Sequence, residues 1–126
     1  MKKRTALIVM FWLLGAVAIF HVLILTGYIP FDQVWAGRLQ SVEEMRRFET
    51  FSLLVNLFML SILWVKYQHI QAGKNNQAIN ILIWIFCGFF LLNTLGNLFA
   101  KSIWELVLGT AFTLAASILC FIIAKR

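Results

Sequence analysis

Three long stretches of this chain contain no charged side chain, and they constrain its fold more than any other feature. They cover residues 5–31, 75–100 and 106–124, and a fourth, shorter stretch covers 50–65. A helix needs about 20 consecutive apolar residues to cross the hydrocarbon core of a bilayer. Charged residues make up only 13% of the chain and hydrophobic residues 62%. A soluble domain has about 25% charged residues, so lipid is the expected solvent.

The short stretch 50–65 becomes long enough to span when its helix begins further upstream. Ser41 followed by Glu44 has the pattern of a capping box, in which the serine accepts a backbone hydrogen bond at the start of a helix. Carboxylates in the first turn, here Glu43 and Glu44, also suit the positive end of the helix dipole. The sequence therefore predicts a helix that begins at Val42 and carries Glu49 into the membrane.

We expect one all-α transmembrane domain, 1–126, in which four transmembrane helices form a bundle. The predicted helices cover 5–27, 42–67, 77–100 and 105–124. Gly27 and Pro30 end the first helix, and Gly73 makes the turn between the second and the third. After Pro30, apolar residues recur at helical spacing up to Ser41. This pattern predicts a short interfacial helix in the first outer loop.

Both chain termini are expected in the cytoplasm (N-in/C-in), because basic residues concentrate on the cytoplasmic side of membrane proteins. The cytoplasmic set would be Lys2, Lys3, Arg4, Lys66, Lys74, Lys125 and Arg126, against Arg38, Arg46, Arg47 and Lys101 outside. The alternative for the first stretch is a cleavable signal peptide ending at 16–18, but the apolar run continues to Thr26. The expected location is the cytoplasmic (inner) membrane of a bacterium.

Several other classes of protein are not supported by the residues present. The net charge of +6 comes from basic residues scattered over segment ends, without the patch that binds nucleic acid. Cys87 and Cys120 lie in different apolar stretches, so no disulfide or thiol relay is expected. His21 and His69 are also far apart, and no metal site and no cofactor are predicted. The expected partner is the lipid bilayer, and a second copy of the chain or another membrane subunit is left open.

Polar side chains inside the predicted spans mark a candidate site, because each costs free energy in a bilayer unless it is paired or hydrated. Glu49 and Asn56 share one face of the second predicted helix, and polar residues from Asn93 to Lys101 share one face of the third. At about 1.5 Å per residue, both faces run from the midplane into the outer leaflet, at the level of His21. The predicted cluster, opening outward, is Glu49, His21, Asn56, Asn93, Asn97 and Lys101.

Two interpretations of this cluster remain open. The asparagines favour simple hydrogen bonding between helices. Glu49 requires more, because a carboxylate in a membrane must meet a partner such as Lys101, Arg46 or His21, or be protonated. It is either a salt-bridged residue that holds two helices in register or a site for a proton or a cation.

Small residues follow one face of the last predicted helix. Gly109, Thr113 and Ser117 recur at a spacing of four residues. Faces of this kind let membrane helices approach closely. We expect them to serve helix packing, either within the bundle or across a dimer.

Three short segments of the chain, 34–39, 43–49 and 95–101, resemble parts of small bacterial four-helix integral membrane proteins for which no activity is known. Together they cover about a fifth of the chain. The resemblance implies a class of protein and no mechanism.

Two classes of function fit these features. The expected one is a non-enzymatic multi-pass membrane protein, either a structural or accessory subunit or a module that binds a small solute or ion. The alternative is a membrane-embedded enzyme that acts on a lipid or isoprenoid at the outer leaflet, with Glu49 or His21 as general acid or base. An enzyme needs a substrate-sized pocket beside its ionisable groups, whereas an accessory protein needs only paired polar groups and a packing face.

Overall fold

The computed structural model describes residues 2–30, 40–100 and 103–125, and within these residues it contains helices and turns but no strands. The helices are α1 (Lys3–Leu25), α2 (Val42–Gln71), α3 (Gln77–Asn97) and α4 (Thr110–Ala124), with a π-helical turn η3 (Glu105–Gly109) leading into α4. Four segments are long and apolar enough to cross a membrane, the last being Glu105–Ala124. The prediction of an all-helical chain with four such helices is confirmed. The predicted interfacial helix falls on residues 31–39, which lie outside the described residues.

Local signals account for the facing ends of α1 and α2. Gly27 adopts a φ of +86° directly after α1, a conformation that suits glycine and ends a helix. Ser41 is the N-cap of α2, and its Oγ accepts a hydrogen bond of 3.1 Å from the backbone N–H of Glu44. The predicted cap is therefore confirmed, and it places Glu49 in the second turn of α2.

A tight turn joins α2 to α3. Gly73, with a φ of +69°, ends α2, and the Asn76 side chain accepts hydrogen bonds from the first N–H groups of α3. α2 extends to Gln71, four residues beyond the prediction, because the helix continues until it reaches the glycine. α3 stops at Asn97 rather than at residue 100.

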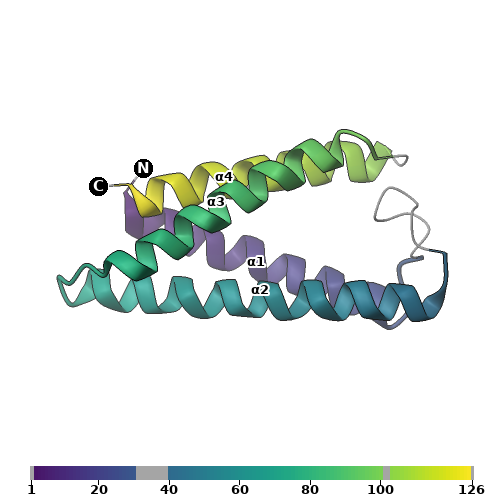
Figure 1. The fold of residues 1–126 in the computed structure, drawn as a ribbon, viewed down its shortest axis with the longest axis horizontal. Coiled ribbons are helices and arrows are strands. Elements are labelled where there is room, and N and C mark those ends of the chain that lie inside the picture. Colours follow the sequence, from purple (N-terminus) through teal and green to yellow (C-terminus); the bar gives the residue numbers. More distant parts are fainter. Residues whose placement is uncertain (1, 31–39, 101–102, 126) are drawn as a thin grey trace.

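The four helices form two antiparallel pairs (Figure 1). α1 packs along α2, α3 packs along α4, and α1 also contacts α4. Both chain termini and the turn at 72–76 lie at one end of the bundle, which we call the terminal end (Figure 1). The opposite end, where α1 ends and α2 begins, is the distal end.

The buried apolar residues are distributed unevenly between these ends. The larger cluster draws on all four helices: Ala6, Leu7, Met10, Leu14, Met59, Leu63, Ile83, Phe86, Phe90, Ala116, Leu119, Cys120, Ile123 and Ala124. At the distal end the second cluster consists of Ile24 and Met45, from α1 and α2 alone. Distal residues between α1 and α2 are therefore enclosed chiefly by that helix pair.

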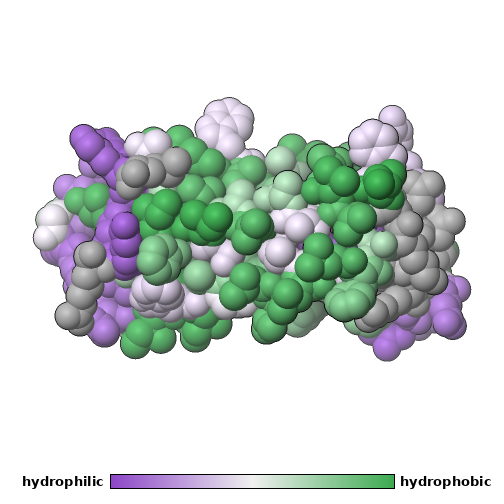
Figure 2. Space-filling model, turned by 90° about the horizontal axis from the view of Figure 1, so that it is seen from above, coloured by the Kyte–Doolittle hydropathy of each residue, from purple (hydrophilic) through white to green (hydrophobic). Residues whose placement is uncertain are grey.

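The surface of the bundle suits a lipid environment. Figure 2 shows a broad apolar band between polar ends. Large side chains within the band are open to the surroundings, with Trp12 78% and Leu92 69% exposed. Soluble proteins rarely expose apolar area on this scale, and the band is compatible with a multi-pass membrane protein.

Candidate functional site

The candidate site is a contact between two ionisable side chains on neighbouring helices. His21 lies one turn before the end of α1, and Glu49 lies in the second turn of the antiparallel α2. Nδ1 of His21 and Oε2 of Glu49 are 2.5 Å apart. Among the described residues this is the only contact within 4.0 Å between a basic and an acidic side chain. The contact therefore joins α1 to α2 near the distal end.

Both side chains are largely withdrawn from the surroundings. Glu49 is 1% exposed and His21 16%. Ile24 and Met45, one turn further toward the distal end on α1 and α2, form the small apolar cluster beside the pair. In such surroundings a lone charge is costly, so the two groups depend on each other.

Asn56 joins the same two helices closer to the membrane centre. It is buried, and its Nδ2 donates a hydrogen bond of 2.9 Å to the backbone carbonyl of Leu14 on α1. Asn56 and Glu49 are seven residues apart and therefore share one face of α2. His21, Glu49 and Asn56 thus belong to a single α1–α2 interface.

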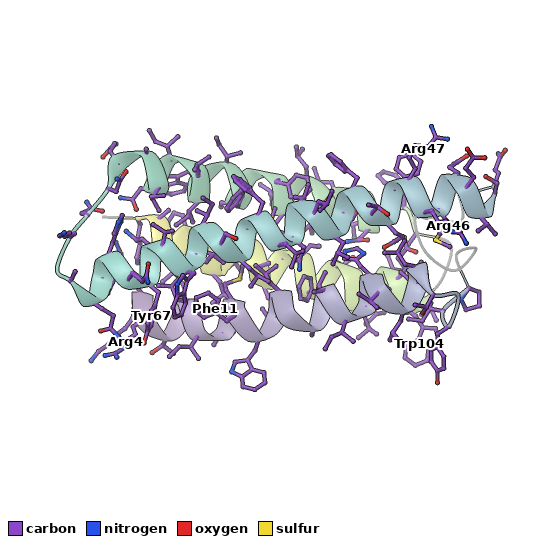
Figure 3. The ribbon with its side chains drawn as sticks, turned by 90° about the horizontal axis from the view of Figure 1, so that it is seen from below. Arg4, Phe11, Arg46, Arg47, Tyr67 and Trp104 are labelled. Carbon is purple, nitrogen blue, oxygen red and sulfur yellow. The ribbon has the colours of Figure 1, made fainter. Side chains whose placement is uncertain are left out.

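Two other partners of Glu49 were considered from the sequence. Arg46 is exposed near the start of α2, at the end opposite to Arg4 and Tyr67 (Figure 3). Lys101 lies outside the described residues. His21 is the proposed partner whose contact with the carboxylate the structure describes.

The asparagines of α3 are not brought to this pair. Asn93 is exposed, and Asn97 is half-buried against α4, where its Nδ2 lies 3.4 Å from Oγ1 of Thr113. The buried stripe of α3 passes through Phe90 and Thr94. Asn93 falls beside that stripe because successive residues of a helix are rotated by about 100°.

The small face of α4 is directed toward α3. The hydroxyl groups of Thr113 and Thr94 are 2.9 Å apart, and Ser117 Oγ donates a 2.9 Å hydrogen bond to the carbonyl of Cys87. A Cβ atom placed on Gly109 would lie 2.9 Å from side-chain atoms of Asn97. All three small residues therefore lie where α3 and α4 approach each other closely.

A second polar cluster, at the terminal end, was not predicted as a site. Lys66 is 2% exposed, and its Nζ donates a 2.6 Å hydrogen bond to Oδ1 of Asn80 and lies 3.4 Å from Oδ1 of Asn75. From the sequence, Lys66 was considered only as a topology signal. Their spacing in the sequence indicates the contact, because Lys66 lies seven residues before Gly73 and Asn80 seven residues after it. Residues equally distant from a tight turn face each other in a helical hairpin.

Comparison with other proteins does not extend this description. The chain matches no model of a known protein family, no curated protein and no solved structure.

Proposed function

We propose that this chain is a non-catalytic multi-pass membrane protein, an accessory or small-ion-binding module whose His21–Glu49 pair binds a proton within the membrane. The observation that carries the proposal is the 2.5 Å contact between an imidazole and a carboxylate that are both largely buried. Intramembrane ionisable residues are rare because they are costly, and they commonly mark pathways for ions or protons.

The pair has the chemistry for this role. A neutral imidazole beside a carboxylate leaves one negative charge at the site, and one added proton makes the pair neutral overall. Net charge is costly in apolar surroundings. The neutral, protonated pair is therefore more favourable at the α1–α2 interface than the negatively charged, deprotonated pair. Binding of a proton can therefore be transmitted to the packing of two helices.

The surroundings of the pair favour this module over an enzyme. Two pockets of the described chain are lined by residues of α3 and α4 and of the segment 103–108, and neither includes His21 or Glu49. The pair lies between two helices, whereas a lipid-modifying enzyme needs a substrate-sized space beside its acid or base.

Difference infrared spectroscopy in lipid nanodiscs tests the proton-binding role. The spectra compare about pH 5 with about pH 8, the range in which an imidazole changes charge. A His69→Gln background leaves His21 as the only imidazole. We expect one carboxyl band and one imidazole band to change together. Glu49→Gln and His21→Gln should each remove both changes, because the two groups share the proton.

The matched control is Glu43→Gln, at an exposed position at the start of α2. Because Glu43 is not part of the pair, this variant should leave the paired carboxyl and imidazole changes in place. An imidazole change that persists unaltered in Glu49→Gln would contradict a shared proton.

We also propose that the protein lies in a bacterial cytoplasmic membrane with both termini in the cytoplasm, and that its 31–39 segment forms an interfacial helix outside. The excess of basic residues at the terminal end supports this orientation. It places the His21–Glu49 pair in the outer leaflet, where it would respond to protons on the outer side.

Single cysteines test the orientation. We expect Gln40→Cys and Ala72→Cys, in a background lacking Cys87 and Cys120, to react with a membrane-impermeant maleimide from opposite sides of the membrane. Both positions are exposed, and neither change alters the charge count that determines topology. Labelling of Ala72→Cys in intact cells, without labelling of Gln40→Cys, would show the reverse orientation.

A further inference from the structure

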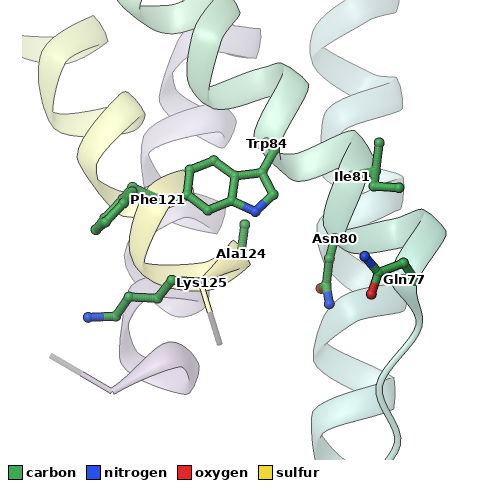
Figure 4. A pocket seen from close by; sticks show the side chains of 7 residues that line it. All are labelled: Gln77, Asn80, Ile81, Trp84, Phe121, Ala124 and Lys125. Atoms are coloured by element: carbon green, nitrogen blue, oxygen red, sulfur yellow. The ribbon is translucent and has the colours of Figure 1, made fainter.

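The terminal end of the bundle contains a cavity between the start of α3 and the end of α4. Its volume is about 300 Å³. Trp84 and Phe121 form an apolar wall. Their rings pack edge to face, and the ring centroids are 5.4 Å apart. Gln77, Asn80 and Lys125 supply polar groups nearer the terminal end (Figure 4). The cavity is therefore apolar toward the membrane centre and polar toward the water.

The buried cation Lys66 determines how Asn80 presents its amide to this cavity. An ammonium group only donates hydrogen bonds, so it must face Oδ1 of Asn80, which it meets at 2.6 Å. The amide NH₂ then points the other way, and one of its N–H groups donates to Oδ1 of Asn75 at 2.7 Å. Asn80 thus has one N–H left to donate, next to the positive charge of Lys66. Such a group favours an anion.

The distribution of basic and acidic side chains also favours an anion at the terminal end. The acidic side chains of the described residues lie at the start of α2 and in η3, away from the terminal end: Glu43, Glu44, Glu49 and Glu105. Lys3, in the first turn of α1, adds to the positive potential at Lys66. Among the described residues no carboxylate lies within 4.0 Å of Lys66 or Lys125. A buried cation without a counter-ion is costly, and an anion from outside the chain would offset that cost.

We propose that this cavity binds an anionic phospholipid, with its phosphate group at Asn80 and Gln77, an acyl chain along Trp84 and Phe121, and Lys125 on the opposite side adding positive charge. Basic pockets between membrane helices are a known form of headgroup recognition. A lipid fits better than free phosphate because the apolar wall, with Ile81, Trp84 and Phe121 exposed, continues into the lipid-facing band. This site is separate from the His21–Glu49 pair, and either can exist without the other.

Native mass spectrometry of the detergent-solubilised full chain tests the proposal. The probes are dioleoyl phosphatidylglycerol and dioleoyl phosphatidylcholine in equal amounts, which share their acyl chains and differ in headgroup charge. We expect the phosphatidylglycerol adduct to predominate in the wild-type protein. Lys125→Gln should reduce that preference about fivefold, the ratio that corresponds to about 1 kcal/mol per cation near a membrane surface.

Lys74→Gln is the matched control, because it removes the same charge from an exposed position at the same end of the bundle. Lys74 does not line the cavity, so its removal should reduce the preference less than the removal of Lys125 does. Equal binding of the two lipids, or equal effects of Lys125→Gln and Lys74→Gln, would overturn the proposal. Displacement of phosphatidylglycerol by excess inorganic phosphate would show a phosphate site and overturn the assignment to a lipid.

Discussion

Replacing Ser117 by leucine is expected to destabilise the protein by about 3 kcal/mol, because it adds volume where α3 and α4 are closest. Ser117 is buried, and its hydroxyl donates a 2.9 Å hydrogen bond to the Cys87 carbonyl. In return, Sγ of Cys87 lies 3.3 Å from the Ser117 carbonyl. A leucine in this place must separate the helices or adopt a strained rotamer. The measurement is the free energy of unfolding in mixed micelles.

Two control variants separate packing from hydrogen bonding. Ala111→Leu adds volume at an exposed position of α4 and should change stability by less than about 0.5 kcal/mol. Ser117→Ala keeps the residue small but removes the hydroxyl, and should cost about 0.6 kcal/mol. If Ser117→Leu proved as stable as Ala111→Leu, this face of α4 would not pack against α3.

Much of the helical framework could be predicted from the sequence because its signals are local. A charge-free run of membrane length identifies a span without knowledge of its neighbours. The N-cap at Ser41 and the turn at Gly73 depend on residues within one helical turn, and both are present in the structure. Helix ends moved by a few residues, as with α2, where the helix continues to the next residue that can end it.

The membership of the candidate site was harder to predict because it depends on how each helix is rotated about its axis. Glu49 and Asn56 were placed on one face of α2, and the structure has both at the α1–α2 interface. On α3, the stripe of Asn93 and Asn97 lies beside a second stripe of the same helical spacing, which contains Phe90 and Thr94. The rotation of α3 follows the small face of α4, which buries Thr94 and leaves Asn93 exposed. Periodicity within one helix contains no information about that partner.

The Lys66–Asn80 contact was missed for a related reason. A lysine near a helix end is expected to extend toward the interface, so that its charge reaches water. In the structure Lys66 is instead covered by the turn and by α3, and its acceptors are two asparagine carbonyls. Polar residues near the ends of spans therefore need to be compared across a hairpin as well as along one helix.

Removing the imidazole of His21 is expected to have the largest effect among changes at the polar pair. His21→Leu leaves the Glu49 carboxylate, which is 1% exposed, without its contact to α1. Loss of one member of a buried charged pair costs about 3 kcal/mol in the free energy of unfolding. Glu49→Leu should cost less, about 1–2 kcal/mol, because the remaining imidazole can be neutral and lose only a hydrogen bond.

The double variant His21→Leu/Glu49→Leu distinguishes a coupled pair from two independent residues. Two leucines can pack beside Ile24 and Met45, so the double variant should recover most of the stability, with a coupling energy of about 2 kcal/mol. Val22→Leu, at an exposed position of α1, is the control and should be close to wild type. Additive costs of the two single changes would mean that His21 and Glu49 do not act as a pair. In that case the proton-binding role proposed for them would lose its physical basis.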